Sequence, residues 1–524
     1  MTDVVQPVRD AGAAIARRRL RDDVVVSHGL LSLLNTSLTP SDATTADLLF
    51  LRAALDSAGI ELLLVRGQDE RPVLVIDRRL RKTVQRILAA ACADEPFYAR
   101  RVEGVRTHPS LVADGHFTDR ATGAILLFRP RVTAAGGLRY GAAGAVRVEF
   151  WRFGDDTISA PSPNSLTRPR LPRAEFVTEQ VERYGQRWTT LAGMFTPRAD
   201  DIRFDIDIVF SWVDGSSIEW QRARARRMQS YVVGEGDDSQ ARFRQLDELK
   251  YALRSVHLFA PWIRNVYIVT DSPPPEWLAE HPRVHVVRSA EFFADPSVLP
   301  THNSHAVESQ LANIPGIAEH FLYSNDDMFF ARPISAQSFF SAGGVTRFIE
   351  ATTRIGLGEN NAERSGFENA ARVNRRLLEE RFGVVITRHL EHTPVPLVKS
   401  VMRELQAEFP EEFRRTAASR FRSATDISVT NSLYHYYALL TGRAVIERNV
   451  KALYVDTTAK SGLTAMRKVL TKRNVDLLCL NDGSFPEITD EERADAVRSF
   501  LDGYYPIAGP WERPAVPATL GQLG

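Results

Sequence analysis

The sequence predicts an α/β fold with a mostly parallel sheet as its core, a helical insertion within that core and a small α+β module in front of it. Two observations predict this fold. After residue 203, short runs of β-forming residues alternate with helical patterns, as in chains that build parallel sheets. The first such run, 206–213, is rich in apolar residues, as expected of a strand that is buried on both faces.

Residues 1–160 are expected to form the small module. Apolar periodicity predicts helices over 46–58 and 80–92, and strands over 61–66, 72–76, 124–131 and 145–153. Four prolines between residues 158 and 172 argue against the interior of a regular element. Residues 161–200 are therefore expected to be a linker and lead-in to the core.

The first part of the core is predicted over 201–334. Its strands are expected at 206–213, 265–270, 283–288 and 320–324, and its helices at 246–259 and 307–314. Residues 335–449 carry long helical patterns, notably 397–409 and 430–440, and predict the helical insertion. Residues 450–524 are expected to return to the core as strand-like and turn-rich sequence, with a C-terminal tail.

Composition narrows the class of protein. Hydrophobic residues make up 44% of the 524 residues and charged residues 25%, which is ordinary for a globular protein. The net charge of +1 argues against a general polyanion binder, so no nucleic-acid partner is expected. The two cysteines, Cys92 and Cys479, give no disulfide framework and no cysteine metal site, and they suit a reducing compartment.

No signal peptide and no apolar run of about 18–20 residues is recognised, so a cytoplasmic protein is expected. The basic cluster Arg17–Arg21 leaves two alternatives open, contact with anionic lipid at the inner face of the membrane or a solvated helix face. Peripheral membrane association and a homo-oligomer both stay open.

Acidic residues follow three of the four predicted core strands. They are Asp214, Asp271 and the trio Asn325-Asp326-Asp327. Ligands of open α/β sheets bind outside the carboxyl ends of the strands, where carboxylates are suited to hold a divalent cation and through it a diphosphate. The alternative is that these residues serve turns and helix caps.

Cations and a histidine complete the candidate groups. Lys250 and Arg254 share one face of a predicted helix, with Arg244 in the preceding loop, and such cations suit a phosphate clamp. The alternative is a solvated face paired with Asp247 and Glu248. His392, fixed by Pro394, suits a general base, and Arg422 suits the charge of a transferring phosphoryl group. A structural histidine and a surface ion pair are the competing interpretations.

The amino-acid sequence of four ordered segments resembles that of the Stealth family. The first block is 205–215 with Glu219-Trp220, and Asp214 stands in it where some members carry Asn. The second runs through 242–255 and 260–270 to 275–278, the third from 303–309 to 321–329, and the fourth from Val450 to Cys479-Leu480-Asn481-Asp482. The sequence between the third and fourth blocks, with His392 and Arg422, is similar to that of the eukaryotic member.

The family comprises sugar-1-phosphate transferases, among them bacterial capsule polymerases and the enzyme that tags lysosomal hydrolases with N-acetylglucosamine-1-phosphate. The resemblance implies a GT-A-like core, a UDP-sugar donor, a saccharide acceptor and a Mg²⁺ or Mn²⁺ ion. It also implies an exopolysaccharide or capsule product.

The reaction that the resemblance implies is transfer of a hexose- or N-acetylhexosamine-1-phosphate to a saccharide hydroxyl, with release of UMP and formation of a phosphodiester. In it, His392 takes the acceptor proton, Arg422 stabilises the phosphoryl oxygens, and Asp326 and Asp327 hold the metal. Asp326 thereby takes part in catalysis, and the donor is expected to contact Asp214, Arg244, Lys250, Arg254, Asp271 and Asn325. The runner-up is a hexosyltransferase that releases UDP, and the third alternative is a carbohydrate-binding protein without activity.

Overall fold

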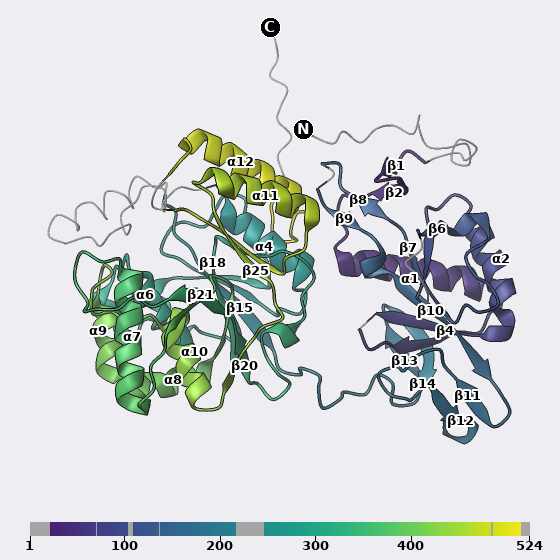
Figure 1. The fold of residues 1–524 in the computed structure, drawn as a ribbon, viewed down its shortest axis with the longest axis horizontal. Helices are drawn as coiled ribbons and strands as arrows, with labels where there is room; N and C mark the ends of the chain where they lie inside the picture. The colour runs from purple at the N-terminus through teal and green to yellow at the C-terminus, as the bar shows by residue number, and fades with distance from the viewer. Residues whose placement is uncertain are drawn as a thin grey trace, which may run out of the picture. The chain divides into compact units, whose positions relative to one another are not determined.

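The computed structural model describes residues 21–69, 71–102, 108–135, 137–215, 246–483 and 486–514. The chain divides into two compact units, 1–198 and 199–524 (Figure 1). We describe each unit by itself.

The first unit places two helices against a mixed sheet. The helices are α1 (Pro40–Asp56) and α2 (Arg81–Ala91), and the sheet runs in the order β12-β11-β10-β7-β5-β6, with β4 paired to both β10 and β3. Two of its short strands are β6 (Ser110–Leu111) and β11 (Thr157–Ser159). Helix α1 begins at a capping box in which the Thr39 hydroxyl and the Asp42 carboxylate each accept a backbone N–H of the other residue. The main strands are β3 (Leu63–Arg66), β4 (Pro72–Asp77), β5 (Tyr98–Arg101), β7 (Ala124–Phe128) and β10 (Val146–Phe153).

Residues 161–198 differ from the expected linker, because they belong to the first unit. They contain β12 (Arg170–Pro172), β13 (Thr178–Arg183) and β14 (Gln186–Leu191). Trp188 is 1% exposed and packs in the same core as the α1 and α2 side chains. Pro172 lies in β12 at the edge of its sheet, a position where a strand tolerates proline. The prolines therefore exclude helix here and not strand.

The second unit is built on a five-stranded sheet in the order β17-β16-β15-β18-β23. The strands are β15 (Ile206–Ser211), β16 (Val266–Val269), β17 (Val284–Val287), β18 (His320–Asn325) and β23 (Val395–Val398). The first four run parallel, and β23 pairs antiparallel with β18. This sheet confirms the predicted α/β class with its mostly parallel core.

A second, three-stranded sheet begins where β18 ends. Strand β19 (Met328–Phe330) pairs antiparallel with β26 (Leu477–Asn481), which pairs parallel with β25 (Ala452–Asp456). Helix α4 (Glu248–Phe259) packs against β19. Residues 450–524 were expected to return to the core, and they do so through β25 and β26 of this sheet.

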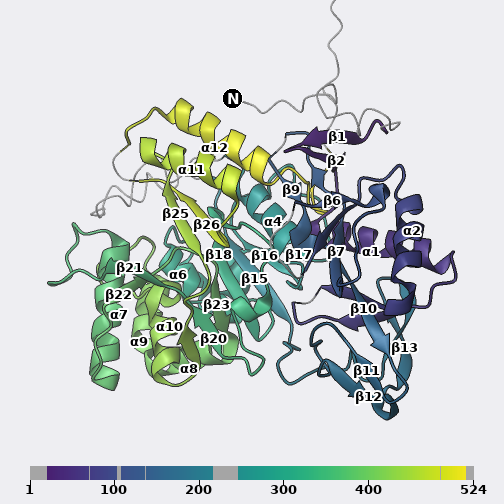
Figure 2. The same ribbon diagram turned by 45° about the vertical axis from the view of Figure 1, so that its right-hand side comes forward.

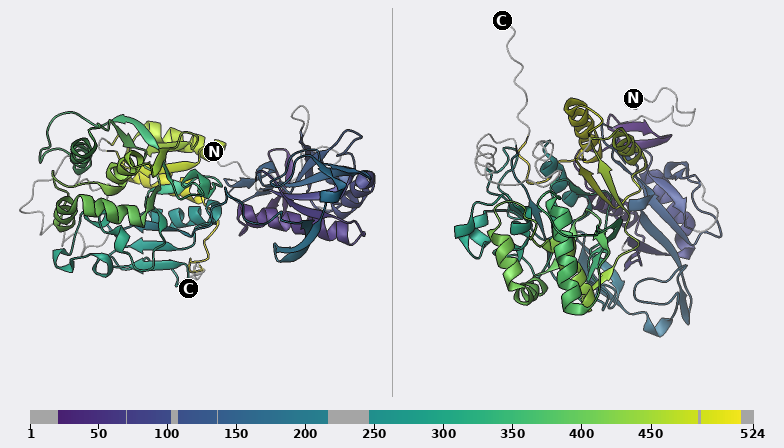
Figure 3. Two further views of the ribbon diagram at one scale, coloured as in Figure 1. Left: turned by 90° about the horizontal axis from the view of Figure 1, so that it is seen from below. Right: turned by 60° about the vertical axis from the view of Figure 1, so that its left-hand side comes forward.

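The same C-terminal stretch contains two helices that the sequence analysis missed. They are α11 (Lys460–Lys472) and α12 (Asp490–Tyr504), and they pack on each other in every view (Figures 2 and 3). The glycine in α11 explains part of the miss, because glycine disfavours helix. A Cβ at Gly462 would lie 1.8 Å from the Asp456 carbonyl oxygen, so close packing of α11 on β25 requires this residue.

Residues 335–449 are mixed and only partly helical. The helices are α7 (Gly366–Phe382), α8 (Lys399–Glu408), α9 (Pro410–Ala418) and α10 (Tyr434–Leu440), and they lie on the other side of this unit from α11 and α12 (Figures 2 and 3). The helix expected over 397–409 begins as strand, since Leu397 and Val398 belong to β23. The segment therefore contributes a strand to the main sheet as well as a layer of helices.

One smaller difference concerns helix length. The helix expected over 307–314 is α6 (Ser304–Glu308), followed by a separate 3-10 turn at Leu311–Asn313. Among the described helices, none combines the length and the apolar character that crossing a bilayer requires.

Candidate functional site

The site forms where the two sheets of the second unit meet. Strand β18 ends at Asn325, Asp326 and Asp327 make the turn, and β19 starts at Met328. The backbone N–H of Leu480 donates to the Asp327 carbonyl at 2.9 Å, which fixes β26 beside this turn. The predicted trio thus lies between the carboxyl ends of the main-sheet strands and the second sheet.

His392 lies between two asparagine amides. Its Nε2 is 3.2 Å from Nδ2 of Asn325, and its Nδ1 is 3.1 Å from Nδ2 of Asn481. The Asn481 oxygen already accepts the backbone N–H of Asp482 at 2.6 Å, so the Asn481 nitrogen faces the ring and donates to Nδ1. A neutral imidazole accepts at only one nitrogen, so we assign the ring proton to Nε2, and the Asn325 amide, whose Nδ2 faces Nε2 in the structure, would have to be flipped for its oxygen to accept that proton. The lone pair of His392 is therefore at Nδ1.

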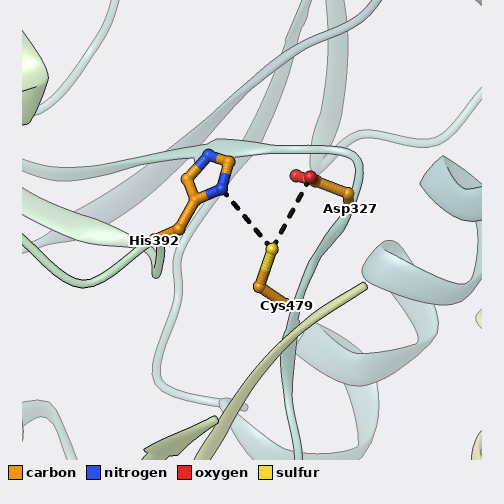
Figure 4. Close-up of side chains that lie close together, drawn as sticks. All are labelled: Asp327, His392 and Cys479. Atoms are coloured by element: carbon orange, nitrogen blue, oxygen red, sulfur yellow. Dashed lines mark hydrogen bonds between the residues drawn. The ribbon is translucent and has the colours of Figure 1, made fainter. Parts of the chain in front are cut away.

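Cys479 joins His392 to Asp327. Its Sγ is 3.5 Å from Nδ1 of His392 and 3.6 Å from Oδ2 of Asp327, and all three side chains point to one spot (Figure 4). The thiol is fully buried in β26. Burial raises the pKa of Cys479 well above its usual range, and the Asp327 carboxylate adds to the shift. The group is therefore a thiol rather than a thiolate in the absence of a cation.

Further carboxylates surround the trio. Burial raises the pKa of Asp326 well above its ordinary value, and the charges of Asp327, Glu248 and Asp482 raise it further. Glu248 lies in the first turn of α4, is 8% exposed, and has a pKa raised to about 7, chiefly by burial. Burial also raises the pKa of Asp482, which follows β26, although Arg493 opposes the shift. The concentration of acidic groups is costly without a cation.

These residues fit a hard divalent cation such as Mg²⁺ or Mn²⁺. Oδ1 of Asp327 is buried and has no hydrogen-bond partner among the described residues, an unusual state for a carboxylate oxygen. Asp326 and Asp327 are adjacent and supply the oxygen ligands that such cations prefer. A bound cation would satisfy the open oxygen and offset the mutual repulsion of the carboxylates.

Asp214 and Asp271 lie at the same edge of the main sheet. The backbone N–H of Asp214 donates to the Ser272 hydroxyl at 2.9 Å, and Oδ1 of Asp271 accepts the backbone N–H of Ser289 at 2.9 Å. Ser211 of β15 pairs in register with Asn325 of β18, which places the ends of both strands side by side. No described contact joins Asp214 or Asp271 to the carboxylates around Asp326.

The predicted phosphate clamp on α4 has a different role. Arg254 donates to both oxygens of Glu512 at 2.7 Å and to the Tyr505 carbonyl at 2.9 Å, and Nζ of Lys250 is 3.9 Å from Glu512. Since successive helix residues are about 100° apart, neither cation shares the face of Glu248. Glu512 thus neutralises this pair and ties the C-terminal segment to α4. Arg244 lies outside the described residues.

Arg422 belongs to a neighbouring polar cluster. Its Nη2 donates to the Ser304 hydroxyl at 2.9 Å, and its charge opposes the pKa rise that burial gives Tyr323. Tyr323 lies on β18 two residues before Asn325. Arg422 therefore lies within electrostatic reach of the strand that carries the trio, and no described hydrogen bond connects it to His392.

Comparison with known proteins shows the family. The chain is 57% identical over 505 residues to the exopolysaccharide phosphotransferase CpsY of Mycobacterium tuberculosis, covering 96% of this chain and 95% of that protein. It is 54% identical over 482 residues to an exopolysaccharide phosphotransferase of Nocardia farcinica, covering 92% and 90%. Models of Stealth protein conserved regions 1 to 4 match residues 204–232, 242–348, 391–439 and 467–520. The chain belongs to the Stealth family.

The Stealth regions differ in extent from the four blocks described above. The second and third blocks both fall within region 2, and region 3 is the stretch 391–439 that contains His392 and Arg422. Region 4 begins at 467, after β25, and not near Val450. The site is the place where regions 2, 3 and 4 meet. Region 2 contributes Asp327, region 3 contributes His392, and region 4 contributes Cys479.

Solved structures similar to this Stealth protein include a galactosyltransferase, LgtC, in complex with donor and acceptor sugar analogues. It has 10% identity and a TM-score of 0.30 over 59% of this chain and 98% of that one. The bifunctional glycosyltransferase WbbM has 9% identity and a TM-score of 0.29 over 60% and 53%. Similarity at this level supports no further conclusion.

The structure adds four residues to the predicted set. Cys479 and Asn481 lie in β26 and Asp482 directly follows it, in a segment that the sequence analysis quoted only as part of the fourth block. Glu248 was considered only as a surface partner of Lys250 and Arg254. An acidic residue at the end of a strand was the signal for Asp482, as it was for Asp326. No sequence signal distinguished Glu248, because its burial depends on tertiary packing.

Proposed function

We propose that this Stealth protein transfers a hexose- or N-acetylhexosamine-1-phosphate from a UDP-sugar to a hydroxyl of a growing exopolysaccharide, releasing UMP. The observation that carries the proposal is the position of His392, which Asn325 and Asn481 hold next to a cluster of carboxylates suited to a divalent cation. The names of the relatives support phosphotransfer in exopolysaccharide synthesis as the reaction class.

His392 would act as the general base. The two asparagines hold the ring and its tautomer, and Nδ1 would take the proton of the acceptor hydroxyl once that hydroxyl displaces the Asn481 amide, as the acceptor oxygen attacks the β-phosphorus. The phosphoanhydride bond to UMP breaks and a phosphodiester forms. The anomeric bond of the sugar is not broken, so its configuration is retained.

Asp326 and Asp327 would hold a Mg²⁺ or Mn²⁺ ion. When bound, this ion neutralises diphosphate charge and eases the departure of UMP. Asn325, at the end of β18, stays beside His392 as a candidate contact to substrate, and Asp214 and Asp271 at the same sheet edge stay candidates for donor binding. Arg422 would stabilise phosphoryl oxygens if the transferred group reaches the Tyr323 side of β18.

The proposal includes the setting of the reaction. The donor is a nucleotide sugar and the acceptor is a saccharide. The reaction takes place in the cytoplasm, at the inner face of the membrane. Arg254 is paired with Glu512 and Lys250 lies 3.9 Å from the same carboxylate, so the proposal gives neither cation a part in donor binding.

Product analysis tests the reaction. The protein is incubated with a panel of UDP-sugars, Mg²⁺ and exopolysaccharide fragments, and UMP and UDP are separated and quantified by ion-exchange chromatography. We expect UMP, in step with a phosphodiester signal in the ³¹P spectrum of the polymer. UDP without a phosphodiester would instead establish the runner-up, a metal-dependent hexosyltransferase. If neither UMP nor UDP is released with any donor, the result would favour a carbohydrate-binding protein without activity.

A further inference from the structure

We propose that Asp327, His392 and Cys479 form a site for a thiophilic divalent cation of the Zn²⁺ class, which shares Asp327 with the site for the hard cation. One ligand atom from each residue lies within 4.8 Å of the other two. The set contains a carboxylate oxygen, an imidazole nitrogen and a sulfur, and a sulfur ligand favours Zn²⁺ over Mg²⁺.

The two distances from the sulfur to the other ligand atoms match those of a tetrahedral zinc site. With Zn–S near 2.3 Å and Zn–N and Zn–O near 2.1 Å, tetrahedral angles separate sulfur from either other ligand by about 3.6 Å. The structure places Sγ of Cys479 3.5 Å from Nδ1 of His392 and 3.6 Å from Oδ2 of Asp327. A cation could therefore enter with little movement of these side chains (Figure 4).

The surroundings orient the ligands. Zinc-binding histidines commonly use their second nitrogen to hold an outer partner, and Nε2 of His392 has Asn325 at 3.2 Å. Cys479 is fixed in register between Met328 of β19 and Tyr454 of β25. The cation would replace two hydrogen bonds to Nδ1 of His392, one from the Asn481 amide and one with the Cys479 thiol.

Binding changes the protonation of one group. The S–H bond of Cys479 breaks as the metal–sulfur bond forms, and the proton leaves to solvent. The cation would then occupy the lone pair of His392 and one carboxylate of the hard-cation site. Inhibition of transfer by Zn²⁺ follows, and this consequence rests on the proposed function, whereas the binding itself does not.

Cobalt spectroscopy on the full chain tests the binding. Co²⁺ replaces Zn²⁺ in such sites, and a cobalt–thiolate bond gives a charge-transfer band in the near ultraviolet. The chain has two cysteines, so Cys92→Ala is a matched control for Cys479→Ala, since Cys92 is equally buried but lies in the core of the first unit. We expect the band in the wild type and in Cys92→Ala, its absence in Cys479→Ala, and its loss on adding Zn²⁺.

The Cys92→Ala protein decides the matter even if Cys479→Ala fails to fold, because Cys479 is then the only thiol left. No band in this folded variant overturns the proposal. Asp327→Asn should weaken cobalt binding at least about tenfold, and unchanged affinity would remove Asp327 from the site. UMP release in Mg²⁺ alone is measured separately, so a failure of the proposed function would not affect the absorbance result.

Discussion

The side-chain nitrogen of Asn481 lies 3.1 Å from Nδ1 of His392, while the oxygen of the same amide is held by the backbone N–H of Asp482. The backbone thus dictates which end of the amide faces the imidazole. Asn481 is a positioning residue, since it acts on the tautomer of His392.

Asn481→Asp should reverse that tautomer, because a carboxylate accepts from N–H and would draw the ring proton to Nδ1. We expect kcat to fall by about 10²–10⁴-fold while the KM for the donor changes little. Asn449→Asp, the same change at an exposed position, is the control. Equal kcat values for the two variants would show that the tautomer does not matter.

His392→Ala should abolish most turnover, with a loss of about 10²–10⁴-fold, and leave donor binding intact. Turnover is followed by UMP release and donor binding by calorimetry. The control is His285→Ala on the edge strand β17, where the ring contacts Tyr267. Near wild-type turnover in His392→Ala would refute its role as the base.

Asp327→Asn should raise the Mg²⁺ concentration for half-maximal activity at least about tenfold, because it removes a charged ligand beside the open Oδ1. Asp205→Asn is a suitable control, since that carboxylate is exposed and pairs with Arg264 at 3.1 Å. A Mg²⁺ dependence that is the same in both variants would place the cation elsewhere.

Arg254→Ala should act on stability. It leaves Glu512 buried at 5% exposure without its bidentate partner, and breaking such a pair costs about 3–5 kcal/mol. Chemical denaturation measures the loss, and Arg414→Ala, from an exposed pair with Glu411, should change the free energy of unfolding by less than about 0.5 kcal/mol. A stable Arg254→Ala protein with a raised donor KM would instead support the original hypothesis, that Arg254 binds donor phosphate.

The metal-free protein should become more stable as the pH falls from about 8 to 6. The pKa of Glu248 is raised to about 7 in the folded chain, so folding binds a proton between the ordinary value of 4.5 and 7. The cost of the ionised carboxylate, about 3 kcal/mol from this shift, is present above pH 7 and relieved below it. The raised pKa of Asp326 acts in the same direction.

Thermal melts across this pH range test the relation. Glu248→Gln should flatten the dependence, and saturating Mg²⁺ should reduce it, because a cation stabilises the ionised carboxylates. Stability that rises with pH in the metal-free wild type would contradict the burial of these charges.

The strands of the main sheet could be predicted because their residues are mostly apolar and bounded by polar turns. The position of Asp326 and Asp327 followed from the same pattern. Helix α11 was missed, since Gly462 lowers helix propensity for a reason that appears only when α11 packs on β25. Tertiary packing overrode the local signal there.

Two errors in the candidate site have one origin. Glu248 and Arg254 lie on one helix, and the sequence cannot say which face turns to the carboxylates and which to the C-terminal segment. The partner of Arg254 is Glu512, 258 residues away, and no local pattern indicates such a pair. His392 and Arg422 were candidates by residue type alone, and the family resemblance is what linked them to one reaction, since a lone histidine or arginine has no periodic signal.

The contacts that make the site span long stretches of chain: Asn325 to His392 is 67 residues, and His392 to Cys479 is 87. Closing loops of this length is slow compared with forming helices. During refolding, affinity for cations should therefore appear late, after the helical signal, because β26 has to reach β19 first. The time course of metal binding would then report the last step of assembly. A ribosome-bound chain that ends before Leu477 lacks β26 and would not bind the cation at this site.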